Sequence, residues 1–342
     1  MRHNLRMPMR ILVTGATGFI GRRLTRRLLA HGHEVTAIVR ATSVRELVPA
    51  GAHLVEGDLR DGRGLARAAS GAECVLHLAG VVAASQAEGY DQVNAAGTRR
   101  LAEYLAALPA APRMVLCSSL AAAGPSVPGR PRREEDPPAP VSRYGRSKLA
   151  GEHALRALAS DLESVVVRPP IVYGPGDPAF VPALAAMAKA GIAPRPAASS
   201  CRYSLVHVDD VCTVMEAAME RGRTLSPDDP AAGVYTVSDG VEHSWAGMCT
   251  AVARAMGRKP PLMVPVPAPA VHAVAWLSEM AARLSGPAAF PVVNRDKAAE
   301  GRCPAWTCST DKAARELGFT PSVSLEAGLA GMFDADRRKT SC

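Results

Sequence analysis

Short apolar runs alternate with longer amphipathic stretches through the first half of the chain. The runs are rich in valine, isoleucine and leucine with little polar alternation, which is typical of strands buried on both faces of a sheet. Strands are predicted at Arg10–Val13, Glu34–Val39, His53–Glu56, Cys74–Leu78, Met114–Cys117 and Val165–Arg168. Helices are predicted between them at Ile20–His31, Val44–Pro49, Gly62–Ser70, Tyr90–Leu108 and Tyr144–Ser160. This strand–helix–strand repetition predicts the α/β class, with a doubly wound parallel sheet.

The pattern changes after Pro169, where proline and glycine become frequent. Pro169–Pro178 is predicted to be a loop, and Pro260–Pro269 holds too many prolines for a regular helix. Helices are predicted at Ala179–Ala190, Val211–Arg221, Val271–Leu284, Thr310–Leu317 and Leu325–Ala335. Ser309 is expected to cap the helix that begins at Thr310, and Gly318 is expected to end it. These residues predict a smaller, mainly helical lobe over the carboxyl edge of the sheet.

The chain carries 40 Lys and Arg against 32 Asp and Glu, a net charge of +8. Arginines gather in Ile20–His31 and at 130–133, but no nucleic-acid-binding motif accompanies them, so we predict no nucleic-acid partner. The 8 cysteines are scattered and lack zinc spacing, which predicts no metal site and a reduced, cytoplasmic setting. The apolar stretch Val264–Leu284 is broken by prolines and charges, so no transmembrane segment is predicted, and peripheral membrane contact stays open.

A glycine-rich turn, Thr14–Gly21, lies directly between the first predicted strand and the first predicted helix. Gly15 would allow the tight turn, Gly18 would let the backbone approach a pyrophosphate, and Gly21 would let the helix pack closely. The start of the helix would then present free N–H groups to the phosphates. A purely structural turn is the alternative, but the flanking elements favour a dinucleotide site. The predicted contacts of this loop are Gly15, Thr17, Gly18, Phe19, Ile20 and Gly21.

The second strand ends in Val39-Arg40, without the carboxylate that NAD-preferring sites place near this point. A carboxylate would repel a ribose 2′-phosphate, whereas a guanidinium can bind it through two hydrogen bonds. We therefore predict that NADP is preferred, with NAD also usable if Arg40 faces solvent or stacks on the adenine. Ser43 and Arg45 could assist Arg40.

Three further residues follow predicted strands at the same edge of the sheet. Asp58 is placed to accept a hydrogen bond from an adenine amino group, or it could cap the next helix. Ala79 and Gly80 are small where a cofactor would pass.

Tyr144 and Lys148 are spaced so that they share one face of a predicted helix. A phenol titrates near pH 10, and a neighbouring cation would lower its pKa toward the working range. Ser119 ends the fifth predicted strand, where its hydroxyl could hold a substrate oxygen while Tyr144 moves the proton. His77, in the fourth strand, is interpreted as a hydrogen-bonded core residue.

With these motifs the chain resembles the extended short-chain dehydrogenase/reductase superfamily, in its NAD-dependent epimerase/dehydratase-like branch, over essentially its whole length. The residues that carry the resemblance are Thr14–Gly21, Gly57–Leu59, Leu78–Gly80, Asn94 in Val93–Thr98, Ser118-Ser119, Tyr144 with Lys148, Arg168–Gly176 and His207–Asp210. The resemblance implies catalysis by Ser119, Tyr144 and Lys148 with hydride transfer at a nicotinamide. It implies that Lys148 also holds the nicotinamide ribose. Further cofactor contacts that it implies are Leu59, Asn94, Ser118, Tyr144, Pro170 and Val172.

The sequence pattern, read together with the resemblance, divides the chain into parts. Residues 9–170 are expected to form a dinucleotide-binding Rossmann domain, to which 204–237 return. Residues 171–203 and 238–336 are expected to form the substrate-binding lobe, and 1–8 a disordered leader.

Three positions separate this chain from the sugar-nucleotide enzymes of the superfamily. Leu120-Ala121 stand where dehydratases carry an Asp-Glu pair, so the acid and base that eliminate water are missing. Ile171 and Tyr203 stand where those enzymes place the Asn and Arg that bind a sugar diphosphate. The run Ser118–Pro125 instead resembles the 3β-hydroxysteroid dehydrogenase-like reductases, as does Trp306–Phe319 less specifically.

We therefore predict an NAD(P)-dependent oxidoreductase that interconverts a secondary alcohol and a ketone on an apolar, hydroxysteroid-like or keto-acid-like substrate. The substrate would contact Ala121–Arg143, Ala179–Ala190 and Pro260–Leu284. One alternative is a sugar-nucleotide epimerase with tightly bound NAD, and another is a non-catalytic NADP-binding sensor. The expected partner is the small-molecule substrate, and a homodimer stays open.

Overall fold

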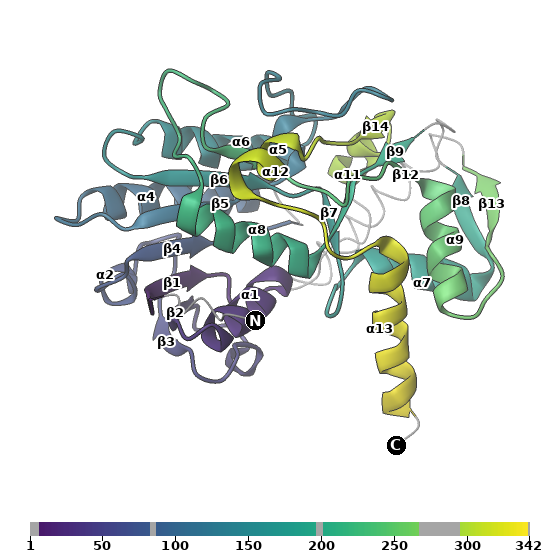
Figure 1. Ribbon diagram of the computed structural model, residues 1–342, viewed down its shortest axis with the longest axis horizontal. Helices are drawn as coiled ribbons and strands as arrows, with labels where there is room; N and C mark the ends of the chain where they lie inside the picture. The colour runs from purple at the N-terminus through teal and green to yellow at the C-terminus, as the bar shows by residue number, and fades with distance from the viewer. Residues whose placement is uncertain (1–6, 83–86, 196–200, 267–294, 341–342) are drawn as a thin grey trace.

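The computed structural model describes residues 7–82, 87–195, 201–266 and 295–340. Seven parallel strands form one sheet in the order β11-β6-β5-β4-β1-β2-β3 (Figure 1). These strands are β1 (Arg10–Thr14), β2 (Glu34–Val39), β3 (His53–Glu56), β4 (Cys74–His77), β5 (Arg113–Cys117), β6 (Ser164–Arg168) and β11 (Val234–Thr236). The order reverses at β1, which pairs with β2 on one side and β4 on the other. The loops after β1 and β4 therefore diverge, which opens a crevice at the carboxyl edge of the sheet.

Helices cover both faces of this sheet, as the doubly wound prediction requires. On one face pack α1 (Phe19–Ala30), α8 (Val208–Arg221) and α12 (Asp311–Leu317). On the other pack α2 (Leu65–Ala68), α4 (Thr98–Ala106) and α6 (Arg143–Arg156). Strand residues alternate between the two cores: Ile11 and Val13 of β1 join the first, and Leu12 joins the second. The predicted fold class is confirmed.

Several predicted helices differ in length from the observed ones. Val44–Pro49 forms only a 3₁₀ turn, η1 (Arg45–Leu47), and α2 is short because Gly62 and Gly64 before it have positive φ. The helix predicted at Tyr90–Leu108 is observed as α3 (Ala87–Tyr90), a π-helical stretch η2 (Asp91–Gly97) and α4. Single π-helical stretches often re-aim side chains at functional sites.

The lobe contains three small sheets beside its helices. They pair β10 (Leu205–His207) with β7 (Ile171–Tyr173), β9 (Arg202–Tyr203) with β12 (His243–Ser244) and β14 (Ala305–Trp306), and β13 (Leu262–Pro265) with β8 (Ile192–Arg195). The lobe's described helices are α7 (Phe180–Ala190), α9 (Trp245–Ala255), α11 (Arg295–Glu300) and α13 (Leu325–Thr340), whereas α5 (Leu120–Ala123) directly follows β5 of the main sheet. The prediction of an unbroken loop at Pro169–Pro178 was wrong, because β7 finds a partner strand far along the chain.

The remaining predictions for the second half have mixed outcomes. Gly318 ends α12 in the left-handed conformation as predicted, but Thr310 rather than Ser309 occupies its N-cap position. α8 begins at Val208, earlier than predicted. The predicted helix Val271–Leu284 lies outside the described residues, as does most of the predicted leader. Among the described residues, no helix combines the length and apolar composition needed to cross a membrane.

Candidate active site

The glycine-rich turn folds against the end of β4 and leads directly into α1. Gly15 has a φ of 74°, and a Cβ placed there would lie 2.6 Å from the backbone nitrogen of Ala79. A Cβ at Gly21 would lie 2.1 Å from the Gly15 carbonyl oxygen, so only glycine lets α1 approach the turn this closely. Gly18 is the N-cap of α1, and no side chain in the described part of the chain caps it. The first N–H groups of α1 are therefore available to a phosphate.

The polar side chains beneath this turn bond to one another. Thr14 Oγ1 accepts from Ala79 N at 3.1 Å and lies 2.6 Å from His77 Nδ1, while His77 Nε2 lies 2.9 Å from Thr98 Oγ1. Burial, with a smaller effect of the Lys148 charge, lowers the pKa of His77 to about 3, so the ring is neutral at physiological pH. The interpretation of His77 as a hydrogen-bonded core residue is confirmed.

Residues at the start of α1 adjoin the loop that follows β7. Thr17, Phe19 and Ile20 are partly exposed there. A Cβ at Gly176 would lie 3.9 Å from the Phe19 ring and 3.5 Å from the Arg22 guanidinium. The glycine-rich turn and the lobe therefore meet at the carboxyl edge of the sheet.

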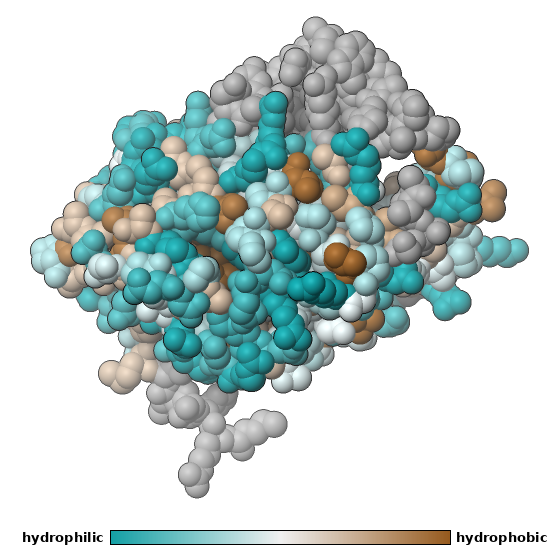
Figure 2. All heavy atoms as spheres, turned by 90° about the horizontal axis from the view of Figure 1, so that it is seen from above, coloured by the Kyte–Doolittle hydropathy of each residue, from teal (hydrophilic) through white to brown (hydrophobic). Residues whose placement is uncertain are grey.

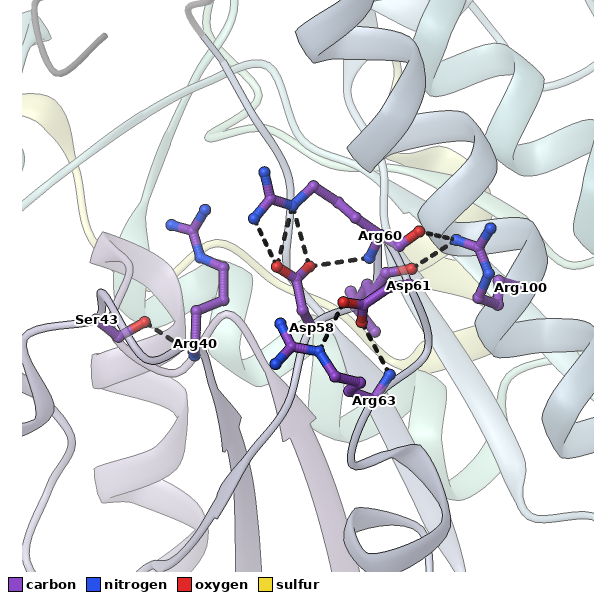
Figure 3. A network of polar contacts seen from close by, with 8 residues as sticks. Arg40, Ser43, Asp58, Arg60, Asp61, Arg63 and Arg100 are labelled. Carbon is purple, nitrogen blue, oxygen red and sulfur yellow. Dashed lines mark hydrogen bonds and ion pairs between the residues drawn. The ribbon is translucent and has the colours of Figure 1, made fainter.

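A hollow of about 400 Å³ lies at the ends of β2 and β3. We call it the arginine hollow; its lining is Arg40, Ala41, Thr42, Glu56, Gly57, Asp58, Arg60, Arg63, Gly64 and Arg67. Four guanidinium groups and two carboxylates line it, so its charge balance favours an anion. Figure 3 shows Arg40 extending from one side of this region while Arg60 and Arg63 bond to carboxylates on the other.

Asp58 is a charged acceptor on the wall of the arginine hollow. Arg60 donates to its carboxylate through Nη2 at 2.7 Å and through its backbone nitrogen at 2.9 Å. Burial alone would raise the pKa of Asp58, but the hydrogen bonds from Arg60 and the charge of Arg40 outweigh it and lower the pKa. The alternative interpretation of Asp58 as a helix cap was wrong, because α2 begins later, after Gly64 as N-cap.

Arg40 and Arg45, both predicted near a 2′-phosphate, lie in different surroundings. The Arg40 backbone nitrogen donates to Ser43 Oγ at 3.1 Å, and its guanidinium lines the arginine hollow. Arg45 instead forms an ion pair with Glu56 and does not belong to the lining. The structure thus brings Arg40 and Ser43 together and directs Arg45 to a neighbouring carboxylate.

The three predicted catalytic side chains converge at the end of β5. Ser119 caps α5, its hydroxyl accepting from Ala121 N at 3.2 Å, and its side chain acts to lower the pKa of the Tyr144 phenol. Tyr144 lies in the first turn of α6, which Ser142 caps by accepting from the Gly145 nitrogen at 3.0 Å. Lys148, one turn further, is buried and donates from Nζ to the Cys117 carbonyl at 2.9 Å.

The expected lowering of the Tyr144 pKa is not what this arrangement produces. Burial of the phenol raises the pKa of Tyr144, and the hydrogen bond with Ser119 opposes this only in part. Burial also lowers the pKa of Lys148, against the influence of Cys117 and Glu152. The expectation was wrong because it considered the neighbouring cation and left out the desolvation of the partly buried phenol, which raises its pKa. A neutral phenol is a proton donor, so the site is prepared to protonate an oxygen.

Asn94 connects the loop after β4 to α6 through hydrogen bonds. From the π-helical stretch η2, its side chain accepts from Val81 N at 2.8 Å and donates to Val81 O at 2.9 Å and to Ser147 Oγ at 3.0 Å. A Cβ at Gly80 would lie 3.0 Å from Lys148 Nζ and 3.1 Å from Asn94 Oδ1. Gly80, Asn94 and Lys148, predicted separately, therefore surround one small space.

A buried ion pair that the sequence analysis missed holds α6 to the sheet. Glu152 of α6 accepts from Ser118 Oγ at the end of β5 and from Arg168 Nη2 of β6 at 2.5 Å. Both charged side chains are only 5% exposed. Ser118, predicted to contact the cofactor, instead directs its hydroxyl to Glu152. The available signal was an acidic residue one turn after Lys148 on the buried face of α6.

Asp296 is a second residue that the sequence analysis missed. From α11 it accepts from the backbone nitrogens of Arg143 at 3.0 Å and Tyr144 at 3.1 Å. It therefore supplies a carboxylate to the N-terminus of α6, where the helix dipole favours negative charge. Nothing in the local sequence links the two segments.

The other predicted contacts are placed as follows. Leu59 is buried in the core, and its carbonyl accepts from Arg100 Nη1 at 2.8 Å. Pro170 and Val172 stand at the start of β7, and Val172 packs against the core beside β10. Tyr203 lies 6.4 Å from Trp245, ring to ring, in the core of the lobe.

Comparison with known proteins gives one family and several reductase relatives. Residues 11–233 match the model of the NAD dependent epimerase/dehydratase family. A ceramide reductase of Caulobacter vibrioides is 36% identical over 259 residues, covering 74% of this chain and 72% of the relative. A 4-hydroxy-2-methyl-3-oxo-4-farnesyl-3,4-dihydroquinoline-1-oxide ketoreductase of Stigmatella aurantiaca is 30% identical over 338 residues, 96% of each. The structure of Thermus thermophilus UDP-glucose 4-epimerase in complex with NAD is 27% identical, with a TM-score of 0.74 over 96% of this chain and 99% of that one.

Proposed function

The chain belongs to the NAD-dependent epimerase/dehydratase family, and from this premise we propose that it is an NADPH-dependent reductase of ketones on long apolar molecules. That it is an oxidoreductase of this family follows from its relatives. The observation that carries the finer proposal is the convergence of Ser119 at the end of β5 with the partly buried Tyr144 phenol and, one turn further along α6, the buried Lys148. Such a pair can hold a carbonyl oxygen and protonate it.

The proposed division of labour uses three side chains. Ser119 would hold the ketone oxygen, and the Tyr144 hydroxyl would donate its proton to that oxygen as the carbonyl is reduced. Lys148 would hold the ribose of the cofactor and place its positive charge near the phenolate that remains. A bound nicotinamide supplies the hydride in this chemistry. The start of α1 fits its pyrophosphate, because Gly18 at the N-cap leaves the first N–H groups without a capping side chain.

The arginine hollow supports NADPH over NADH. Arg40 lines it without a carboxylate bonded to its guanidinium in the described residues, and Asp58 nearby can accept from an adenine amino group. A 2′-phosphate would gain charge-assisted hydrogen bonds from such a lining. We also propose that the enzyme acts in the cytoplasm, where NADPH is available and thiols stay reduced. The seven cysteines in the described part of the chain are free.

The apolar substrate is supported by the relatives and by the lobe. The names ceramide reductase and farnesyl-dihydroquinoline-oxide ketoreductase both describe reduction of molecules with long apolar portions. Ile171 and Tyr203 offer no cation to a sugar diphosphate. A sugar-nucleotide epimerase would retain tightly bound NAD through purification. Protein that is free of NAD after purification would therefore support the reductase. The retained Tyr144 and Lys148 speak against a non-catalytic sensor.

The test is the Tyr144→Phe variant, assayed with NADPH and a panel of ketones that carry long alkyl chains. Loss of the proton donor should reduce kcat by about 10²- to 10⁴-fold while NADPH affinity changes little. Tyr104→Phe, on α4 away from the site, is the matched control and should keep wild-type turnover. Unchanged turnover by Tyr144→Phe, or reaction with UDP-glucose but with no ketone, would refute the proposal.

A further inference from the structure

The small sheet of β8 and β13 has an apolar outer face. It stands at the right-hand end of Figure 1, beyond α9. Its parallel register sets Ile192 beside Leu262 and Pro194 beside Val264, with Ala193 and Met263 between them. Neighbouring residues of a strand point to opposite faces, and Ala193 and Met263 pack into the core of the lobe. We call the opposite face, made by Ile192, Pro194, Leu262 and Val264, the β8–β13 outer face.

This face is exposed where a water-facing sheet usually carries polar side chains. Leu262 is 69% exposed, Ile192 55% and Val264 38%. A strand with one face in water normally alternates apolar and polar residues. In β8 and β13 the residues on both faces are apolar. Contiguous exposed apolar surface marks a site of interaction more often than single exposed residues do. Figure 2 keeps this end of the molecule at the right and shows hydrophobic atoms there beside hydrophilic ones.

Four exposed cations stand at the ends of the same two strands. Lys189 precedes β8 and Arg195 ends it, while Arg258 and Lys259 precede β13. Within the described residues none of the four forms an ion pair. The two segments that build the sheet, 179–195 and 243–266, contain no Asp or Glu. The groove between α9 and α13 differs, since Arg254 and Glu326 both line it and its charge is balanced.

We propose that the β8–β13 outer face docks the enzyme onto an anionic lipid bilayer. Aliphatic side chains would enter the boundary between head groups and acyl chains, while Lys189, Arg195, Arg258 and Lys259 meet the head-group phosphates. The charge pattern favours an anionic bilayer over the other possible partners of this face. A second copy of the chain in a twofold interface would bring the same four cations together, and a nucleic acid would leave the aliphatic side chains without a partner. This inference goes beyond the reductase function and does not depend on it.

The experiment is flotation of the full chain with vesicles of phosphatidylcholine alone and of phosphatidylcholine with phosphatidylglycerol. Binding should be restricted to the anionic vesicles and should weaken as salt is raised. Leu262→Asp should reduce the partition coefficient at least tenfold, and Arg258→Glu with Lys259→Glu should reduce it more than tenfold. The matched controls are Val241→Asp, an exposed apolar residue elsewhere on the lobe, and Arg26→Glu with Arg99→Glu, which change net charge equally.

The outcomes distinguish membrane docking from the proposed reductase activity and from a contact between two copies of the chain. Ile192→Asp, outside the segments expected to contact substrate, should lose vesicle binding as Leu262→Asp does. Its reduction of a short, water-soluble ketone should equal that of wild type, so a failed reductase proposal leaves the vesicle result unaffected. The proposal is overturned if anionic vesicles do not bind the protein, or if the two control variants lose binding as much as the β8–β13 variants. It is also overturned if Leu262→Asp changes only the sedimenting mass of the protein, because the face would then join two copies.

Discussion

Arg40 and Arg45 were both predicted to lie near the ribose 2′-phosphate of NADPH, and substituting each in turn compares their contributions to its binding. Arg40 lines the arginine hollow, whereas Arg45 is held by Glu56 at the surface. Arg40→Asp should weaken NADPH binding by about 10- to 100-fold, because a charge-assisted hydrogen bond contributes about 1.5–3 kcal/mol and the new carboxylate repels the phosphate. Arg45→Ser should leave NADPH affinity within about twofold.

The measurement is fluorescence titration of NADPH and NADH with wild type and both variants. NADH affinity should hold or improve in Arg40→Asp, since a carboxylate there can accept from a ribose 2′-hydroxyl. Wild-type protein that binds NADH at least as tightly as NADPH would contradict the assignment of the hollow.

At the residue scale, the spacing of residues along the chain predicted those side-chain positions that a short stretch of chain determines. The helical spacing of Tyr144 and Lys148 and the position of Ser119 after a buried strand were enough to bring the three together. Asp296 could not be found this way, because its bond to Tyr144 joins segments that are 152 residues apart. The Tyr144 pKa was also beyond the sequence, since its direction depends on burial in three dimensions.

At the scale of elements, the Glu152–Arg168 pair fastens α6 to the strand ends that carry the catalytic serine. Glu152→Gln keeps the size of the side chain but leaves the Arg168 charge buried without its partner. We expect the free energy of unfolding to fall by about 3–5 kcal/mol, as when one member of a buried pair is removed. The same change in Glu163, a largely exposed partner of Arg113, should cost less than about 1 kcal/mol.

Urea unfolding of the two variants compares these costs directly. Equal losses of stability in Glu152→Gln and Glu163→Gln would show that the buried pair does not hold α6 to the sheet. A lower kcat in Glu152→Gln at unchanged NADPH affinity would indicate that the pair also positions Ser119 through Ser118.

Elements were predictable where burial on both faces imposed a composition on them. The strands of the main sheet carry short apolar runs and were all found, apart from β11, which has three residues. The strands of the lobe are two to four residues long and several contain or follow proline. Their partners lie far along the chain, so no neighbouring stretch of sequence marks the pairing. Local composition therefore could not reveal them.

At the scale of the whole molecule, a bound dinucleotide would join parts of the fold that are separate in sequence. The turn after β1, the arginine hollow after β2 and β3, the loop after β4 and the catalytic helix all meet at the edge where the strand order reverses. A ligand that binds this assembled edge and not the unfolded chain stabilises the fold by about 2.7 kcal/mol at 100 times its Kd. For a chain of 342 residues this corresponds to a rise in Tm of about 4 °C.

Thermal unfolding with equal concentrations of NADPH and NADH should therefore give the larger rise with NADPH. Tyr144→Phe should keep the full rise while it loses turnover, because the phenol donates a proton and holds little of the dinucleotide. Arg40→Asp should lose the advantage of NADPH while it keeps the rise with NADH, since the pyrophosphate still binds at the start of α1. If Tyr144→Phe abolished the rise with both cofactors, the phenol would have to be assigned to cofactor binding and the proton donor sought elsewhere.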